Sequence, residues 1–169
     1  MTLDNRPVSS LDSLVDCLTR EDGLMAGLYS ACEEQMAALR DNDVEAIEAA
    51  VKRVNNLIAD INAVEEERLR IQAALDTELG LSPGSRLADV LSHASGETRE
   101  KLDMLLKKMR SKADLLSEVN KINAIMTRRA LTLNRLILRA FNPVGELTYQ
   151  GNGVVEQGAS IKSLVNKTV

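Results

Sequence analysis

Apolar side chains recur every three or four residues along most of this chain, which is the spacing of one buried helix face. The first stripe begins at Leu11, directly after two serines that favour helix N-caps. It weakens near Gly23, because glycine disfavours a helix interior. The pattern predicts a loose arm over residues 1–9 and a helix over residues 10–40, with a bend near Gly23.

A second stripe begins at Val44 and continues to Gly80, a residue type that commonly follows the last turn of a helix. Asn42 precedes this stripe and Glu45 follows three residues later, which is the spacing of a capping box. We therefore expect a second helix over residues 43–79.

The segment LSPGSR then interrupts the pattern, and a short helix is expected over residues 85–93. Residues 97–141 contain no proline or glycine, and apolar residues recur there with heptad spacing. Among twelve consecutive heptad positions only Lys112 and Asn123 are polar. The pattern predicts one helix over residues 97–141, about 67 Å long at a rise of about 1.5 Å per residue.

These elements predict an all-α fold: an elongated antiparallel three-helix bundle or coiled coil over residues 10–141, with a very long C-terminal helix. Residues 142–169 are rich in glycine and polar residues and are expected to form a flexible C-terminal tail. Phe141 is expected to end the last helix and to seal the end of the bundle. A homodimer is compatible with so long a seam, but the pattern does not decide between a monomer and a dimer.

The composition narrows the class of protein. The 169 residues are 44% hydrophobic but only 2% aromatic, so the core must be built from aliphatic side chains. A net charge of −4 argues against a nucleic-acid partner. No apolar run is long enough for stable membrane insertion, and the N-terminus lacks a secretory pattern, so we expect a cytoplasmic protein.

The sequence offers little catalytic chemistry. His93 is the only histidine, and it is expected at the surface of the short helix. Cys17 and Cys32 lack the spacing of a metal or redox motif and are expected to be reduced thiols. The acidic run EEE at residues 65–67 is expected to be a solvated helix face. We expect no enzyme activity, no metal site and no cofactor.

The last helix is asymmetric along its length. The outward heptad positions change from polar to apolar toward the C-terminus, where they are occupied by Leu131 and Leu138. Residues 120–141 contain five basic side chains and no acidic one. Two interpretations remain open: these leucines are covered by a neighbouring helix or a second copy, or they form an apolar strip that another protein binds.

The order of motifs resembles the FlgN family, the cytoplasmic chaperones of the flagellar type III export system. The first helix runs into LRDNDVEAIEAAVKRVNNL, the second helix contains the glutamate-rich EEERLRI, and a short glycine-containing connector follows. A long final helix and a tail containing LTYQGNG complete the match, which covers nearly the whole chain. The tail motif is the more specific part, because many helical hairpins share the rest.

The resemblance implies a chaperone that binds hook-associated proteins, which form the hook–filament junction, and delivers them to the flagellar type III export gate. In the family, the C-terminal helical region engages the substrate and the tyrosine-bearing tail docks on the cytoplasmic domain of the gate. By position, the residues expected to dock on the export gate are Leu147, Tyr149 and Gly151, unless Tyr149 folds back onto the bundle. The expected substrate-binding residues are Ile125, Arg128, Leu131, Arg135, Leu138 and Arg139. The alternative function is a structural coiled-coil or scaffold protein that acts through self-association.

Overall fold

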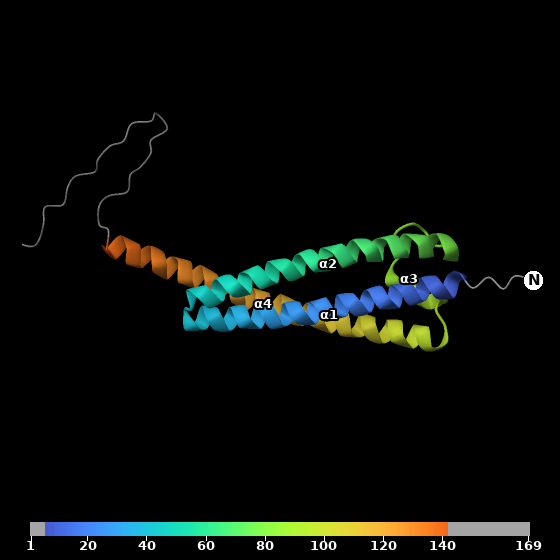
Figure 1. Ribbon diagram of the computed structural model, residues 1–169, viewed down its shortest axis with the longest axis horizontal. Coiled ribbons are helices and arrows are strands. Elements are labelled where there is room, and N and C mark those ends of the chain that lie inside the picture. The colour runs from blue at the N-terminus through green and yellow to red at the C-terminus, as the bar shows by residue number, and fades with distance from the viewer. Residues whose placement is uncertain (1–5, 142–169) are drawn as a thin grey trace, which may run out of the picture. The chain divides into compact units, whose positions relative to one another are not determined.

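The computed structural model describes residues 6–141, which form four α-helices and, within that range, no strand (Figure 1). The helices are α1 (Arg6–Asp41), α2 (Val44–Leu79), α3 (Leu87–His93) and α4 (Gly96–Phe141). The all-helical prediction is confirmed. The expected tail over residues 142–169 and the first five residues of the expected arm lie outside the described residues.

The chain divides into two compact units, Met1–Thr127 and Arg128–Val169. The described part of the first unit contains α1, α2, α3 and most of α4, and that of the second unit contains residues 128–141, the end of α4. Helix α1 begins at Arg6, so the last four residues of the expected arm are helical. Pro7 is compatible with this start, because a proline in the first helical turn removes only an N–H that has no intrahelical partner.

The turn between α1 and α2 differs in detail from the sequence expectation. The N-cap of α2 is Asp43, whose carboxylate accepts a hydrogen bond from the backbone N–H of Ala46 at 3.0 Å. The expected cap, Asn42, instead adopts a φ of 54°, and asparagine is one of the few residues that tolerates this left-handed conformation. The prediction for Gly80 is confirmed, since this residue follows α2 with a φ of 67°.

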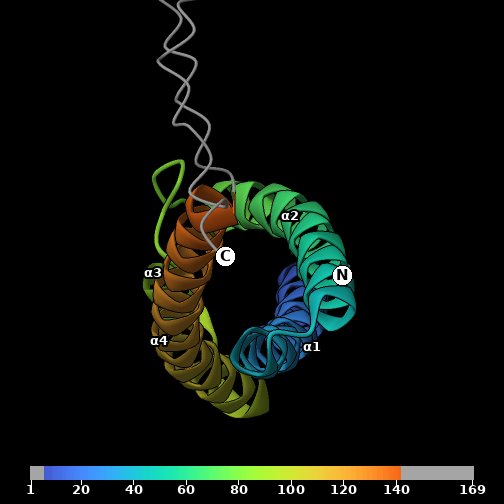
Figure 2. The same cartoon turned by 90° about the vertical axis from the view of Figure 1, so that its left-hand side faces the viewer.

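Polar contacts fix the directions of the helices in the first unit. Arg20 Nη2 lies 2.6 Å from Glu67 Oε1, and Arg53 Nη1 lies 2.5 Å from Glu34 Oε1. Because the residue numbers rise along α1 as they fall along α2, these two helices are antiparallel, and Figure 2 shows α2 and α4 on either side of α1.

Two further contacts join α1 to α4. Lys112 Nζ donates to Asp22 Oδ1 at 2.6 Å, and Asn123 Nδ2 donates to the carbonyl of Cys32 at 2.9 Å. Residue numbers rise together in this pair, so α4 runs parallel to α1 through the first unit.

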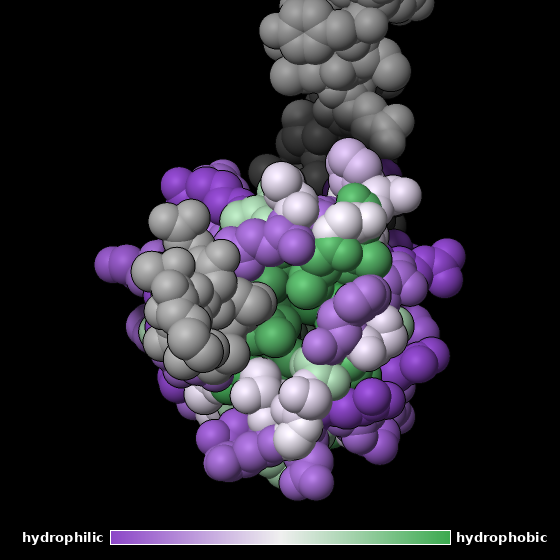
Figure 3. Space-filling view, turned by 90° about the vertical axis from the view of Figure 1, so that its right-hand side faces the viewer, coloured by the Kyte–Doolittle hydropathy of each residue, from purple (hydrophilic) through white to green (hydrophobic). Residues whose placement is uncertain are grey.

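The main apolar core of the first unit lies where α1 and α4 begin and α2 ends, beside α3 (Figure 1). Figure 3 views this end and shows apolar side chains gathered within a rim of hydrophilic ones. Full burial of each aliphatic side chain contributes about 1.5–3 kcal/mol. No aromatic ring is part of this core in the described residues. Its buried members are Leu11, Leu14, Leu18, Leu75, Val90, Ala94, Leu102 and Leu105.

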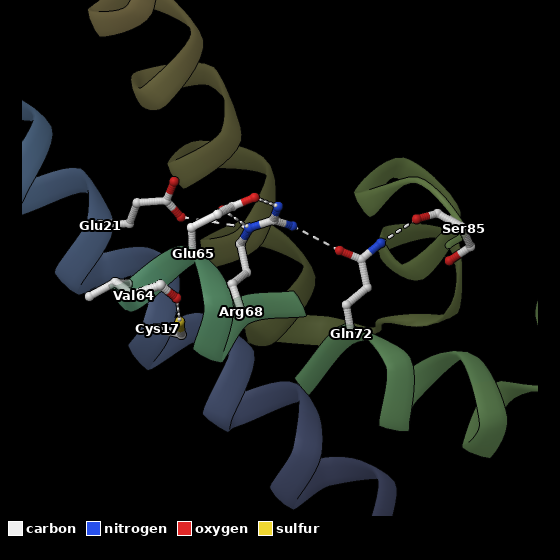
Figure 4. Close-up of polar contacts among 7 residues, drawn as sticks. All are labelled: Cys17, Glu21, Val64, Glu65, Arg68, Gln72 and Ser85. Atoms are coloured by element: carbon white, nitrogen blue, oxygen red, sulfur yellow. Dashed lines mark hydrogen bonds and ion pairs between the residues drawn. The ribbon is translucent and has the colours of Figure 1, made fainter. Parts of the chain in front are cut away.

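Both cysteines are free and buried in α1. The Cys17 thiol donates to the carbonyl of Val64 at 3.5 Å, and burial is the main cause that raises the pKa of this thiol (Figure 4). Burial also raises the pKa of Cys32. Both groups therefore favour the unreactive protonated form.

A polar network connects α1, α2 and the segment after α2 (Figure 4). Arg68 donates to both carboxylate oxygens of Glu65, from Nε at 2.7 Å and from Nη2 at 2.5 Å. Its Nη1 donates to Gln72 Oε1 at 2.8 Å, and the Gln72 amide donates in turn to the carbonyl of Ser85. Glu21 Oε2 lies 3.8 Å from Arg68 Nε. The prediction of a solvated acidic run over residues 65–67 is therefore wrong for Glu65 and Glu67, since both are partly buried and paired with an arginine.

The two carboxylates that face Arg68 differ in their acidity. Burial raises the pKa of Glu21, and the negative charge of Glu65 raises it further. The hydrogen bonds from Arg68 hold the pKa of Glu65 below its ordinary value. Ionised Glu21 consequently destabilises the folded chain, whereas ionised Glu65 stabilises it.

We expect Glu21→Gln to raise the free energy of unfolding by about 1 kcal/mol at pH 7.5. A raised folded-state pKa means that the folded chain binds the proton more tightly, so wild-type stability falls as pH rises above the ordinary carboxyl range. The gain should shrink as pH falls through the raised folded-state pKa of Glu21 toward the ordinary carboxyl value, below which Glu21 is protonated in both states. Urea unfolding monitored by circular dichroism at several pH values measures this difference.

Glu65→Gln is the matched control, with the opposite sign expected. It leaves the Arg68 guanidinium without its paired carboxylate and should cost about 1–3 kcal/mol at pH 7.5. Since the pKa of Glu65 is lowered, this loss should diminish as pH falls through the folded-state pKa of Glu65. A Glu21→Gln protein that is less stable than wild type at pH 7.5 would contradict this assignment.

Candidate partner-binding surface

The terminal segment, residues 128–141, is helical to its end, and every side chain from Leu131 onward is exposed. Monomeric proteins seldom leave so many large apolar side chains uncovered over so few residues, and such a face is typical of a partner-binding surface. The exposed large apolar side chains of the terminal segment are Leu131, Leu133, Leu136, Ile137, Leu138 and Phe141.

Leu133 and Ile137 occupy apolar heptad positions of the last helix, and the sequence pattern predicts that such positions are buried in a seam. Leu133 is 58% exposed and Ile137 is 43% exposed, so the expected division between a buried seam and an outward strip is wrong in the terminal segment. A heptad pattern identifies residues that are able to be buried, but it does not supply the helix that covers them. Phe141 ends α4 as expected, but its ring is 84% exposed, so the prediction that it seals the bundle is also wrong.

The terminal segment is also basic. Among the described residues, no ion pair joins Arg128, Arg129 or Arg135 to a carboxylate. A hollow of about 330 Å³ runs along this segment, lined by Arg128, Arg129, Thr132, Leu133 and Leu136. The arrangement offers apolar contact area beside uncompensated positive charge.

The structure places the expected substrate-binding residues on α4, with Ile125 in the first unit and the others in the second. All of them are exposed, and their role stays a prediction: Ile125, Arg128, Leu131, Arg135, Leu138 and Arg139. The expected docking residues Leu147, Tyr149 and Gly151 lie outside the described residues.

A second hollow, which the sequence pattern did not indicate, lies between α1 and α4 in the first unit. Its volume is about 230 Å³, and its residues come from two stretches that lie far apart in the chain, which is why no local motif marks it. We call it the acidic groove, and it is lined by Tyr29, Glu33, Met36, Leu115, Glu118, Val119 and Ile122.

Tyr29 is half-buried in this groove. A hydrogen bond to the Glu33 carboxylate is the main cause that raises the pKa of Tyr29, and the negative charge of Glu118 adds to it. No cation forms an ion pair with Glu33 or Glu118 anywhere in residues 6–141. The groove therefore combines apolar walls with uncompensated negative charge.

Comparison with known proteins gives one family and one relative. The model of a protein family described as "FlgN protein" matches residues 1–157. The chain is also 25% identical over 122 residues to the uncharacterized protein YvyG of Bacillus subtilis (strain 168), which covers 72% of this chain and 74% of YvyG. No solved structure matches the chain. None of the helices in the described range is both long and apolar enough to cross a bilayer.

Exposure of the terminal segment predicts that charge can be introduced there without unfolding the chain. The double change Leu131→Asp with Leu138→Asp should alter the free energy of unfolding by less than about 1 kcal/mol, since exposed side chains contribute little to the core. Urea titration followed by circular dichroism measures this.

Leu14→Asp is the matched control, because Leu14 is 0% exposed in the core of the first unit. An unpaired buried carboxylate should cost more than about 3 kcal/mol there. If the double aspartate variant lost stability on that scale, Leu131 and Leu138 would belong to a packed interior.

Proposed function

The chain belongs to the FlgN family, and from this membership we propose that it is a cytoplasmic chaperone that binds hook-associated proteins and delivers them to the flagellar type III export gate. Family membership implies a flagellar export chaperone role. The identity of the substrates and their delivery to the gate are the parts that we add as a proposal.

The observation that carries this proposal is the exposed apolar face of the terminal segment. An amphipathic helix of a partner that covers this face would bury several leucines, each contributing roughly 1.5–3 kcal/mol before the costs of association are subtracted. The arginines beside them favour a partner with acidic flanks and accelerate its approach, in a manner that depends on salt. We assign substrate binding to Ile125, Arg128, Leu131, Arg135, Leu138 and Arg139.

Docking at the export gate is assigned to Leu147, Tyr149 and Gly151 through the family resemblance of the LTYQGNG motif. A tyrosine ring provides a large rigid contact area at low cost in conformational entropy, so it suits a pocket on a partner. The neighbouring glycines allow the backbone to adopt a bound shape.

A structural protein that acts through self-association is the second candidate function. It is favoured by the same exposed apolar face, which a second copy could cover as well as a foreign helix. The two functions differ in whether a hook-associated protein is captured.

Substrate capture should depend on the terminal segment. We expect Leu131→Asp with Leu138→Asp to weaken co-purification of hook-associated proteins at least tenfold, because each aspartate removes an apolar contact worth more than the roughly 1.4 kcal/mol of a tenfold change. The measurement is capture of the native flagellar hook-associated proteins on the immobilised full chain.

Leu69→Asp is the control for this experiment, because Leu69 on α2 and Leu131 are both 52% exposed. The control variant should capture substrate as wild type does. Undiminished capture by the double variant, or an equal loss in the control, would remove the terminal segment from the proposal.

Tyr149→Ala should separate docking from capture. We expect the variant to retain helicity and substrate binding, and to lose most of its binding to the cytoplasmic domain of the export gate, because a tail residue contributes mainly to partner contacts. Binding of the chaperone–substrate complex to that domain measures the effect, with Tyr149→Phe as the variant that keeps the ring. A melting temperature several degrees lower in Tyr149→Ala would show instead that the ring packs on the helices.

A further inference from the structure

The acidic groove takes no part in the roles assigned above. Its walls are residues 29–36 of α1 and 115–122 of α4, and each wall is about 12 Å long at the helical rise. Met36, Leu115 and Ile122 line the groove with apolar surface, and Leu115 and Ile122 remain 44% and 40% exposed. The groove therefore offers apolar contact area to about two turns of an incoming helix.

Negative charge lies on both walls of the groove. Glu33 belongs to α1 and Glu118 to α4, both side chains are exposed, and no ion pair in the described residues compensates either carboxylate. The Tyr29 hydroxyl is engaged with Glu33 and leaves the net charge unchanged. An occupant that covers the apolar surface must bring positive charge to each side, because otherwise it would desolvate two unpaired carboxylates.

The last part of the chain carries such charge. Residues 158–169 have the sequence GASIKSLVNKTV, and we call them the lysine segment; they lie outside the described residues. The family match ends at residue 157, so the role assigned from the family does not account for this segment. Lys162 and Lys167 are the only basic residues of the expected tail, and both acidic residues of the tail precede the segment.

The lysine segment has the sequence pattern of a short amphipathic helix. Ile161, Leu164 and Val165 stand at helical i, i+3 and i+4 spacing and would share one face of such a helix. At about 100° per residue, Lys162 and Lys167 would flank this face on opposite sides. The apolar face would therefore meet the apolar walls of the groove while one lysine approached each carboxylate.

Length permits this contact within one molecule. Residues 160–168 would span about 13 Å as a helix, which matches the length of the groove walls. Residues 142–157 reach up to about 53 Å when extended, at about 3.3 Å per residue. Ile122 in the groove and Phe141 belong to one helix and are at most about 28 Å apart along it. A tether of this length gives an effective concentration on the order of millimolar, so even a contact of modest affinity would be occupied.

We propose that the lysine segment binds the acidic groove of its own chain. Its apolar face would cover the groove walls, and its two lysines would pair with Glu33 and Glu118. The contact would close residues 142–157, which include the LTYQGNG motif, into a loop. The inference goes beyond the proposed function and does not rest on it, since neither a hook-associated protein nor the export gate takes part in the contact.

Paramagnetic broadening of NMR signals in the full chain tests this contact. A nitroxide attached to Ser163→Cys would point away from the groove, because position 163 lies opposite the apolar face of the segment. Cys17 and Cys32 are buried with raised thiol pKa values, so they should not take up the label. The nitroxide should broaden the methyl signal of Met36, which lines the groove, and spare those of Val90 in the main apolar core.

A mixed sample identifies which molecule supplies the segment. Isotope-labelled chain without nitroxide is mixed with nitroxide-bearing chain without isotope label, so any broadening there reports contacts between copies. The Met36 methyl signal should keep its full intensity in this mixture. In the chain that carries both labels, the broadening should not depend on protein concentration, because the contact is intramolecular.

Reversal of charge distinguishes a specific contact from random collisions of the tail. Lys162→Glu with Lys167→Glu should lower the ratio of docked to free segment roughly tenfold, because two attractive pairs become repulsive. Glu33→Lys with Glu118→Lys reverses the groove instead and should have the same effect. A chain with all four changes again has opposite charges on the two surfaces, so it should recover the broadening of Met36.

Glu45→Lys with Glu48→Lys is the control, because it makes the same change of charge at exposed positions on α2 and should behave as wild type. Circular dichroism should show equal helicity in all variants. Three results would overturn the inference: a Met36 signal that is not broadened in the full chain, equal broadening in the mixed sample, or no recovery with all four changes. The first result would leave the groove to a helix of another protein, and the second would assign it to a second copy. Capture of hook-associated proteins is measured separately and decides the proposed function alone.

Discussion

The hydrogen bond from the Asn123 amide to the carbonyl of Cys32 is the contact on which the arrangement of the first unit depends most. A core without aromatic rings consists of aliphatic side chains of similar shape, and these pack almost equally well when one helix slides along another. A buried polar side chain allows only the register in which it finds its partner. Asn123 Oδ1 is buried without a partner in the described residues, so this specificity carries a cost of about 1–3 kcal/mol.

Contacts with α1 explain both polar residues at the otherwise apolar heptad positions of α4. Lys112 and Asn123 both reach α1, where they contact Asp22 and the Cys32 carbonyl. The sequence shows these residues as interruptions of a stripe, but it cannot show their partners, because those stand about 90 positions earlier in the chain. The Arg68 network is similar: the periodic stripes run through the positions of Glu21 and Arg68, but these residues are 47 positions apart, so the sequence does not show that they meet.

Sequence patterns that involve only neighbouring residues were sufficient to predict the helices, but they were not sufficient to predict which helix faces are covered. Periodicity and helix-terminating residues such as Gly80 predicted the number and type of elements, because they depend on neighbours within a few residues. The cap of α2 moved by one residue, from Asn42 to Asp43, because both residue types serve as caps and only one can take the left-handed position. The exposure of Leu133 and Ile137 could not be predicted, since an apolar stripe is the same whether or not a helix covers it. The arginines interspersed there also have a protective effect, because charges that interrupt an exposed apolar segment oppose aggregation.

The parallel pairing of α1 with α4 has a consequence for the order of folding. The α1–α2 hairpin closes through a turn of two residues, whereas the Asn123–Cys32 contact closes a loop of about 90 residues and costs more chain entropy. We therefore expect the hairpin to form first and α4 to dock later, with a folding rate limited by this long-range step. Synthesis from the N-terminus reinforces the same order, since the hairpin leaves the ribosome before α4 is complete. During that interval the side of α1 that later packs on α4 faces water, and the nascent chain depends on the rapid arrival of its last helix.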